Sequence, residues 1–429
     1  MFFQKPCISI LIYFVVLTLI PSWTKGQKIS LKAANGSNIN TSNKSISNKV
    51  LGFKPNYLKQ KDLIDLGYWI LGKNSNKRIK SLDTKSIQLH ISGAPGIEYS
   101  LTTGLAATAY TNFAYYTNTD SITSLSSFLV GIGYTEKHQF YIPIQSTIWT
   151  KDNKFNFQGD WRFDHYPLDT YGFGTKTPTS QGYLVSANRI RFYEFGLKHI
   201  GNNIFLGLGI QYDHRWNIQE SLDSTIQSPT DFEKYGFSKS STSLGLGLNF
   251  LYDTRKNSIN PEPGAFLGNL VVRQNLKFLG SSSSWNSVLI DVRKYIQLPF
   301  HEILGLWSYN YFTINGNPPY LDLPGTATDT YGNLGRGYVQ NRFIGKKMMY
   351  LEAELRYGIT RNGFLGGVFF ANAQTFSELN SNQFEGIKPG FGGGLRIKFN
   401  KFSRTNICLD YGFGANGSHG IFANLGEVF

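Results

Sequence analysis

Apolar and polar residues alternate along most of the chain, from about residue 88 to its end. In the segment 349–357 every second residue is apolar, and the positions between them hold Tyr350, Glu352, Glu354 and Arg356. A strand with one face toward lipid and the other toward a polar lumen has this pattern. The repetition of such segments predicts an all-β protein, a transmembrane antiparallel β-barrel.

The alternation predicts about 16 strands, an even number, as single-chain bacterial barrels require. The expected strands cover 88–100, 104–116, 123–134, 138–150, 154–164, 184–198, 203–216, 241–253, 264–276, 285–297, 301–313, 347–359, 363–375, 389–399, 405–414 and 420–429. The longest connections are 165–183, 217–240, 314–346 and 376–388, and all of them lie at the same end of the predicted barrel. Long outer loops and short periplasmic turns are typical of outer-membrane barrels.

The first 87 residues have a different pattern. An apolar run from Ile8 to Ile20, preceded by Lys5, predicts a secretory signal peptide over residues 1–26. The polar residues that follow are expected to be disordered, except for one short amphipathic helix within 57–71. The sequence is compatible with three locations of this helix: inside the lumen, on the membrane surface, or against a partner. The predicted organisation is a signal peptide (1–26), a mostly disordered periplasmic segment (27–87) and an outer-membrane barrel (88–429).

Composition supports strands over helices. The chain has 429 residues with 33 Phe, 25 Tyr and 45 Gly, and only 16% of its residues are charged. After the predicted signal peptide no window is apolar enough for a transmembrane helix, so membrane insertion would require a closed barrel. The formal net charge of +14 is compatible with nucleic acid binding. In an exported barrel, attraction to outer-membrane lipid and lipopolysaccharide is the better explanation, and we expect no nucleic acid partner.

Residues with typical catalytic or metal-binding spacing are not apparent. Cys7 lies in the predicted signal peptide, which leaves Cys408 as a single thiol without a disulfide partner. The seven histidines are scattered without metal-ligand spacing. Neither Asp213-His214 nor the serine run 281–284 resembles a catalytic motif. We therefore expect no metal, no cofactor and no enzymatic activity.

The candidate functional site is the loop tip Gly335-Arg336-Gly337-Tyr338, shortly before the segment 349–357. Glycines permit a tight backbone, and an arginine can bind carboxylates inside a lumen. These properties favour a loop that turns inward. By itself, however, the string favours an ordinary exposed loop carrying one solvated arginine, and only the pattern of the rest of the chain favours the inward loop.

Several motifs, in order along 88–429, resemble the BamA/TamA and surface-antigen type of outer-membrane assembly and translocation barrels, which include two-partner secretion translocators. The loop tip Gly335–Tyr338 resembles the family's Arg-Gly-Phe/Tyr loop motif, and Leu351–Arg356 resembles the strand that follows it. Gly96–Tyr99 with Thr103-Gly104 resembles the first hairpin of the family.

Two further motifs extend the resemblance. Asp253 and Arg255, followed by Pro261 and Gly264, resemble the family's periplasmic turn. Phe429 at the end of an alternating strand resembles the signal by which the assembly machinery recognises a barrel, although Glu427 occupies a position that is usually apolar.

The chain also departs from the family pattern at two places. Residues 27–87 lack the βααββ pattern of a periplasmic POTRA domain, so the chain resembles the branch without these domains. The family often pairs the loop arginine with an aspartate, where this sequence has Asn372. We therefore expect Glu352 or Glu354 to supply the charge that binds Arg336.

The resemblance implies a role in the assembly, insertion or translocation of client outer-membrane or surface proteins. In this hypothesis a client strand adds at a weak seam between the first and last strands, because Gly93, Pro95 and Gly96 interrupt the first one. The alternative is a passive pore, or a structural or adhesin barrel, that keeps the fold without insertase activity. A barrel enzyme is a third and weaker alternative.

Overall fold

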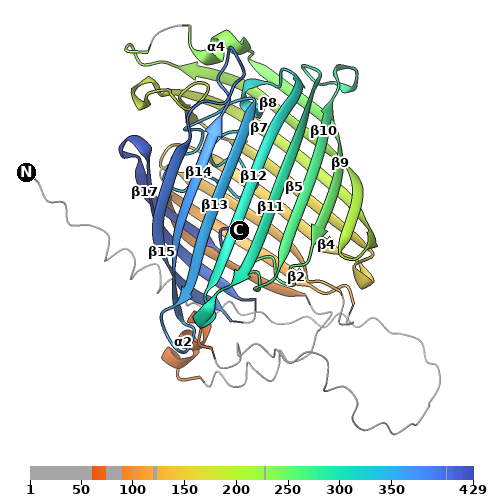
Figure 1. Cartoon of the computed structure of the whole chain (residues 1–429), viewed down its shortest axis with the longest axis vertical. Helices are drawn as coiled ribbons and strands as arrows, with labels where there is room; N and C mark the ends of the chain where they lie inside the picture. The colour runs from red at the N-terminus through yellow and green to blue at the C-terminus, as the bar shows by residue number, and fades with distance from the viewer. Residues whose placement is uncertain (1–59, 74–88, 101, 119–122, 227–228, 402) are drawn as a thin grey trace, which may run out of the picture.

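The computed structural model describes residues 60–73, 89–100, 102–118, 123–226, 229–401 and 403–429. Most of this chain forms one barrel of tilted antiparallel strands (Figure 1). The predicted signal peptide, most of the segment expected to be disordered, and residues 57–59 of the predicted helix lie outside the described residues.

Seventeen strands make up the sheet. They are β1 (His90–Ser100), β2 (Gly104–Tyr115), β3 (Ser126–Thr135), β4 (Phe140–Trp149), β5 (Phe155–His165), β6 (Leu168–Thr170), β7 (Tyr183–Gly201), β8 (Ile204–Ser221), β9 (Ser240–Asp253), β10 (Phe266–Asn275), β11 (Trp285–Gln297), β12 (Ile303–Gly316), β13 (Lys347–Gly358), β14 (Leu365–Phe376), β15 (Lys388–Asn400), β16 (Thr405–Gly414) and β17 (His419–Leu425). β5 and the short β6 both pair with β7, so they are two segments of one strand of the barrel wall. Counted in this way, the wall has the expected 16 strands, which are called staves below.

The strands follow one another around the barrel in chain order, and from β1 to β17 each pairs antiparallel with its neighbour, β5 and β6 both with β7. Two sequence-based expectations need correction. The first strand is continuous and pairs with β2 along all its 11 residues, including Pro95 opposite Ala109. Proline lacks an N–H group, and an edge strand tolerates it because one of its sides has no ladder to supply. The last strand ends at Leu425 instead of residue 429.

The alternation places apolar side chains outside and charged side chains inside, as predicted. On β13 Leu351 is 58% exposed, whereas its neighbours Glu352 and Glu354 are buried. Leu206, Leu208 and Ile210 are likewise exposed on the outer face of β8. Such a surface is stable when lipid covers it. Across the described residues, no helix has the length and apolar character needed to cross a bilayer.

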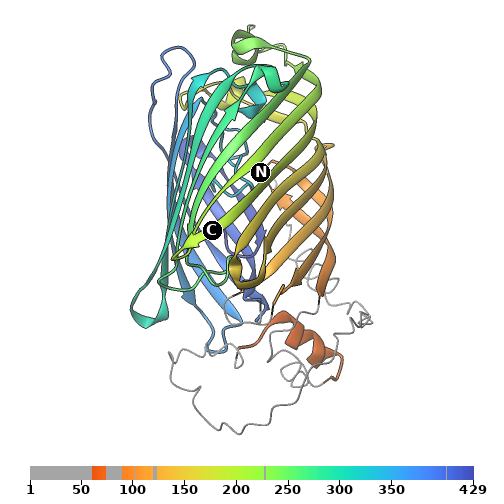
Figure 2. The same ribbon diagram turned by 90° about the vertical axis from the view of Figure 1, so that its right-hand side faces the viewer.

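The two ends of the barrel differ (Figures 1 and 2). Long loops lie at one end with the helix α4 (Asp231–Gly236), which begins with a capping box between Thr230 and Glu233. The short turns lie at the other end, where the helix α2 (Leu63–Ile70) sits below the strands and outside the lumen. Where the structure describes them, the connections also contain the 3-10 turns η2 (Lys151–Asn153), η3 (Thr179–Gln181), η4 (Lys277–Leu279), η5 (Pro299–His301), η6 (Tyr320–Asp322) and η7 (Ala415–Gly417).

Candidate functional site

The loop between β12 and β13 enters the lumen and packs there. Its residues Leu334, Tyr338 and Phe343 are buried in one apolar cluster with Trp307 and Tyr350 of the barrel wall. Burial of so many large side chains holds the loop inside, because their exposure to water would be unfavourable. The candidate motif therefore lies in the lumen and is not an exposed loop.

The loop also contacts the opposite wall. Arg162 of β5 donates a hydrogen bond of 2.6 Å to the carbonyl oxygen of Thr330. Asp322 in η6 binds Arg215 of β8 and accepts a hydrogen bond of 2.6 Å from Ser243 of β9. The loop is thus held from both sides and crosses the lumen.

The loop tip requires glycine for two reasons. Gly335 and Gly337 have φ angles of 78° and 110°, in the left-handed region that favours glycine. The tip also lies directly against β16, where a Cβ atom on Gly412 would be 2.7 Å from the backbone nitrogen of Gly337. Small residues on both sides allow this close backbone approach.

Arg336 is the centre of the site. Its guanidinium lies 2.6 Å from Glu354 and 2.6 Å from Asp410, and it also pairs with Glu352. The Cζ atom stands 3.7 Å from the centre of the Phe370 ring, in a cation–π contact. With its side chain only 2% exposed, Arg336 joins the loop to β13, β14 and β16.

Two more arginines extend the network. Arg356 lies 2.7 Å from Glu354, and Arg396 pairs with Asp410 and lies 2.8 Å from Glu427. Desolvation of buried charges is costly, so such a network is stable only when each charge has well-placed partners. Here three arginines and four carboxylates alternate, and we infer that the network fixes the loop in one position rather than adding much net stability.

The structure places Glu352 and Glu354 against Arg336, together with a carboxylate that the sequence analysis missed, Asp410. The side chain of Asn372 has a different role from the family aspartate: it donates a hydrogen bond of 3.0 Å to the backbone carbonyl oxygen of Arg336. Tyr338 anchors the end of the motif, since its hydroxyl donates to the carbonyl oxygen of Pro389 and accepts a 2.7 Å hydrogen bond from the backbone of Ala415.

The predicted periplasmic turn does not contact Arg336 but spans the barrel end. Arg255 binds Asp253 at 2.9 Å, Pro261 is buried, and Gly264 adopts a φ angle of 86°. This turn, residues 254–265, reaches the β15–β16 turn on another side of the barrel. Asn257 donates to the carbonyl oxygen of Ser403 at 2.9 Å, which closes the contact.

Phe429 lies in the lumen and not on the sheet. After Leu425 the chain turns inward, and the backbone nitrogen of Glu427 donates to the carbonyl oxygen of Ile259 in the turn 254–265. The Phe429 ring is 5.2 Å from the ring of Trp307, and its main-chain oxygen accepts a 2.8 Å hydrogen bond from Arg356. The position of Glu427, which is unusual for a barrel signal, is explained by its contact with Arg396.

The edge strands β1 and β17 lie near each other, as expected for a barrel, but no ladder of paired residues joins them among the residues that the structure describes. Every other pair of neighbouring staves has such a ladder. β17 contains seven residues and β1 contains eleven, so the two edges also differ in length. The seam between β1 and β17 is therefore the place where the hydrogen-bonded wall of the barrel is interrupted.

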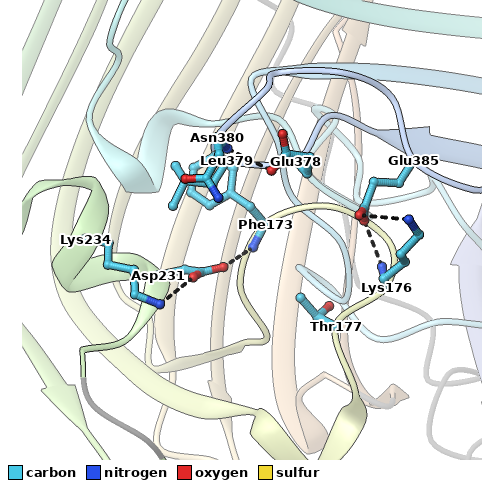
Figure 3. A pocket seen from close by; sticks show the side chains of 9 residues that line it. All are labelled: Phe173, Lys176, Thr177, Asp231, Lys234, Glu378, Leu379, Asn380 and Glu385. Atoms are coloured by element: carbon cyan, nitrogen blue, oxygen red, sulfur yellow. Dashed lines mark hydrogen bonds and ion pairs between the residues drawn. The ribbon is translucent and has the colours of Figure 1, made fainter.

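A cavity of about 290 Å³ lies among the outer loops (Figure 3). Its charged groups bind neighbouring loop atoms: Asp231 accepts from the backbone nitrogen of Phe173, and Glu385 accepts from that of Lys176. Hydrogen bonds from Ser381 lower the pKa of Glu378 on its rim. The cavity is therefore a junction between loops. Its contacts hold the long-loop end of the barrel together.

Comparison with known proteins shows similarity at the level of the fold. No protein-family model matches the sequence, and no curated protein matches it. BamA from Haemophilus ducreyi lacking POTRA domains 1–3 matches with a TM-score of 0.53 and 12% sequence identity, over 85% of this chain and 78% of that chain. CdiB from Escherichia coli matches with a TM-score of 0.51 and 12% identity, over 81% of this chain and 69% of that chain.

These two likenesses agree with the geometry of this chain. It has 16 staves with an apolar exterior, a loop with an Arg-Gly motif inside the lumen, and a seam between its edge strands. The chain therefore has the fold of these two outer-membrane β-barrels, BamA and CdiB.

Proposed function

We propose that this barrel takes part in the assembly, insertion or translocation of proteins at the outer membrane. The observation that carries the proposal is the seam, where β1 and β17 approach each other without a ladder. Unpaired N–H and C=O groups on an edge strand are a template for another strand. A client strand would add there by β-augmentation.

The lumen network supports this proposal by bracing the wall beside the seam. Arg336 connects β13 through Glu352 and Glu354 to β16 through Asp410, and β16 is the neighbour of the edge strand β17. A wall held from inside keeps its shape when the seam opens. The inward turn after Leu425 also leaves the residues beyond it off the sheet, which shortens one edge.

The same contacts argue against a passive pore, which was the alternative. The loop that carries Arg336 crosses the lumen, and the turn 254–265 spans the periplasmic end. Solutes would pass only after both had moved. The proposal includes no enzymatic step and no cofactor, and its partners are client proteins and outer-membrane lipid.

Depletion of the protein followed by quantification of the outer-membrane proteome tests this role. We expect other barrels or surface proteins to decrease selectively, because their insertion or export would lack this factor. Unchanged levels of these proteins, together with altered permeability to small solutes, would contradict the proposal and support the pore.

A further inference from the structure

Helix α2 is fixed to the short-turn end of the barrel. Lys401, in the turn after β15, lies 2.7 Å from Asp65 of the helix, and both side chains are buried. The backbone nitrogen of Lys401 also donates a 2.8 Å hydrogen bond to the helix cap Asp62. On the other side, Lys61 donates from its backbone to Asn362 in the β13–β14 turn. These contacts hold α2 at one height relative to the barrel wall.

The buried side of α2 includes Leu63 as well as Asp65, and the apolar end of the helix is left uncovered. Trp69 is 75% exposed, Ile70 is 58% exposed and Leu71 is 50% exposed. An amphipathic helix on a soluble surface normally buries such residues and exposes its acids. Here the acid Asp65 is buried together with Leu63, whereas the larger apolar side chain of Trp69 is uncovered. Three adjacent large apolar side chains held in one place indicate a surface that another apolar phase covers.

The position of these residues indicates lipid. The apolar outer face of the barrel continues toward this end, where Ile359, just beyond β13, is exposed; Leu395, five residues before the end of β15, is exposed too. Tryptophan is enriched where a membrane meets water. Lys73 follows shortly after this end of the helix, and its charge is complementary to anionic head groups.

We propose that Trp69, Ile70 and Leu71 form an interfacial anchor that inserts into the periplasmic leaflet of the outer membrane and binds anionic phospholipid there. The anchor is independent of the insertase role. It sets the depth of the turn after β15, and so of the wall that lies next to the seam. Lipid immersion of α2 explains both its exposed tryptophan and its buried ion pair.

Spin labelling of the whole chain in vesicles of phosphatidylethanolamine and phosphatidylglycerol (3:1) tests the anchor. A label on Ile70→Cys is compared with one on Arg361→Cys, an exposed position in the neighbouring turn. Cys408 is buried, and the unsubstituted chain controls for its labelling. We expect the label at position 70 to be accessible to oxygen and protected from a water-soluble nickel chelate, whereas the control is accessible to nickel.

Three results would overturn the proposal. Nickel access at position 70 equal to that of the control would place α2 in water. An immobile label protected from both reagents would indicate a protein contact, and dipolar broadening would indicate a second copy of the chain. Two variations test the details: Trp69→Ser should raise nickel access at position 70, and so should replacement of the anionic lipid by phosphatidylcholine. An unchanged profile in either case would refute that part of the anchor.

Discussion

The carboxylate of Asp410 lies 2.6 Å from the guanidinium of Arg336, and this contact ties the lumen loop to β16, the neighbour of the edge strand β17. Asp410 also pairs with Arg396, so it links two arginines that approach from the loop and from β15. Through these contacts the loop is bound to the wall at both β13 and β16. In the proposed mechanism the seam would open beside a wall that is braced from inside.

Replacement of Arg336 by Ala should destabilise the barrel by roughly 3–5 kcal/mol, because Glu352, Glu354 and Asp410 would stay buried without this cation. Denaturant unfolding in detergent measures the effect, and proteolysis of the loop shows whether it has left the lumen. Arg361→Ala, in an exposed turn, is the matched control. An unfolding midpoint equal to that of the control would show that the network does not hold the loop.

Asn372 provides a test of the difference from the related barrels. The Asn372→Asp variant carries the residue that the family often has, yet we expect it to be less stable than Asn372→Ala. The reason is that its carboxylate would face the carbonyl oxygen of Arg336, which offers no hydrogen. Unfolding of both variants in the same detergent measures the order. A more stable Asp variant would mean that its carboxylate reaches the guanidinium instead.

Gly412→Ala should displace the loop tip. The added methyl group would meet the backbone nitrogen of Gly337 at 2.7 Å, and overpacking of this kind costs about 1–3 kcal/mol. Gly358→Ala is the control, because a Cβ atom there has no neighbour within 4 Å. Differential hydrogen exchange in the loop measures the displacement, and equal protection in both variants would contradict the close packing.

Phe429 could act as a packed side chain in the lumen or as an assembly signal, and experiment can separate these two roles. As a lumen side chain packed on Trp307, its replacement by Ala should cost about 3–5 kcal/mol in purified, refolded protein. The control is Phe300→Ala, since Phe300 is 92% exposed in a turn. If Phe429→Ala refolds with unchanged stability but assembles poorly in cells, the residue acts only as an assembly signal.

The sequence predicts most of the sheet, because a period of two assigns each residue to lipid or lumen and a wrong register would expose the charged face. This explains why Glu352 and Glu354 were expected inside. Asp410 was missed because its partner lies in a distant loop, and one acid on the inner face of a strand carries no sign of that partner. The end of β17 was also missed: alternation continues to residue 429, whereas the contacts of Glu427 with Arg396 and Ile259 draw the chain inward.

The helix shows the same limit. Its amphipathic spacing was visible within 57–71, and the structure has α2 at Leu63–Ile70. Which face binds the barrel depends on Lys401, more than 300 residues away in the chain. Local patterns thus predict elements and faces, whereas the partners across the barrel depend on closure of the whole sheet.

The most direct test of the seam is a disulfide between β1 and β17. Cysteine pairs are screened on the two strands for spontaneous oxidation, which requires Cα atoms within about 7 Å. A pair at the matched positions Leu409 and Ala423 links β16 to β17 and is the control away from the seam. The readout is recovery of other outer-membrane proteins in cells depleted of the native chain. Our account predicts that the seam disulfide blocks recovery, that reduction restores it, and that the control pair has no effect. Full recovery with the seam locked would contradict it.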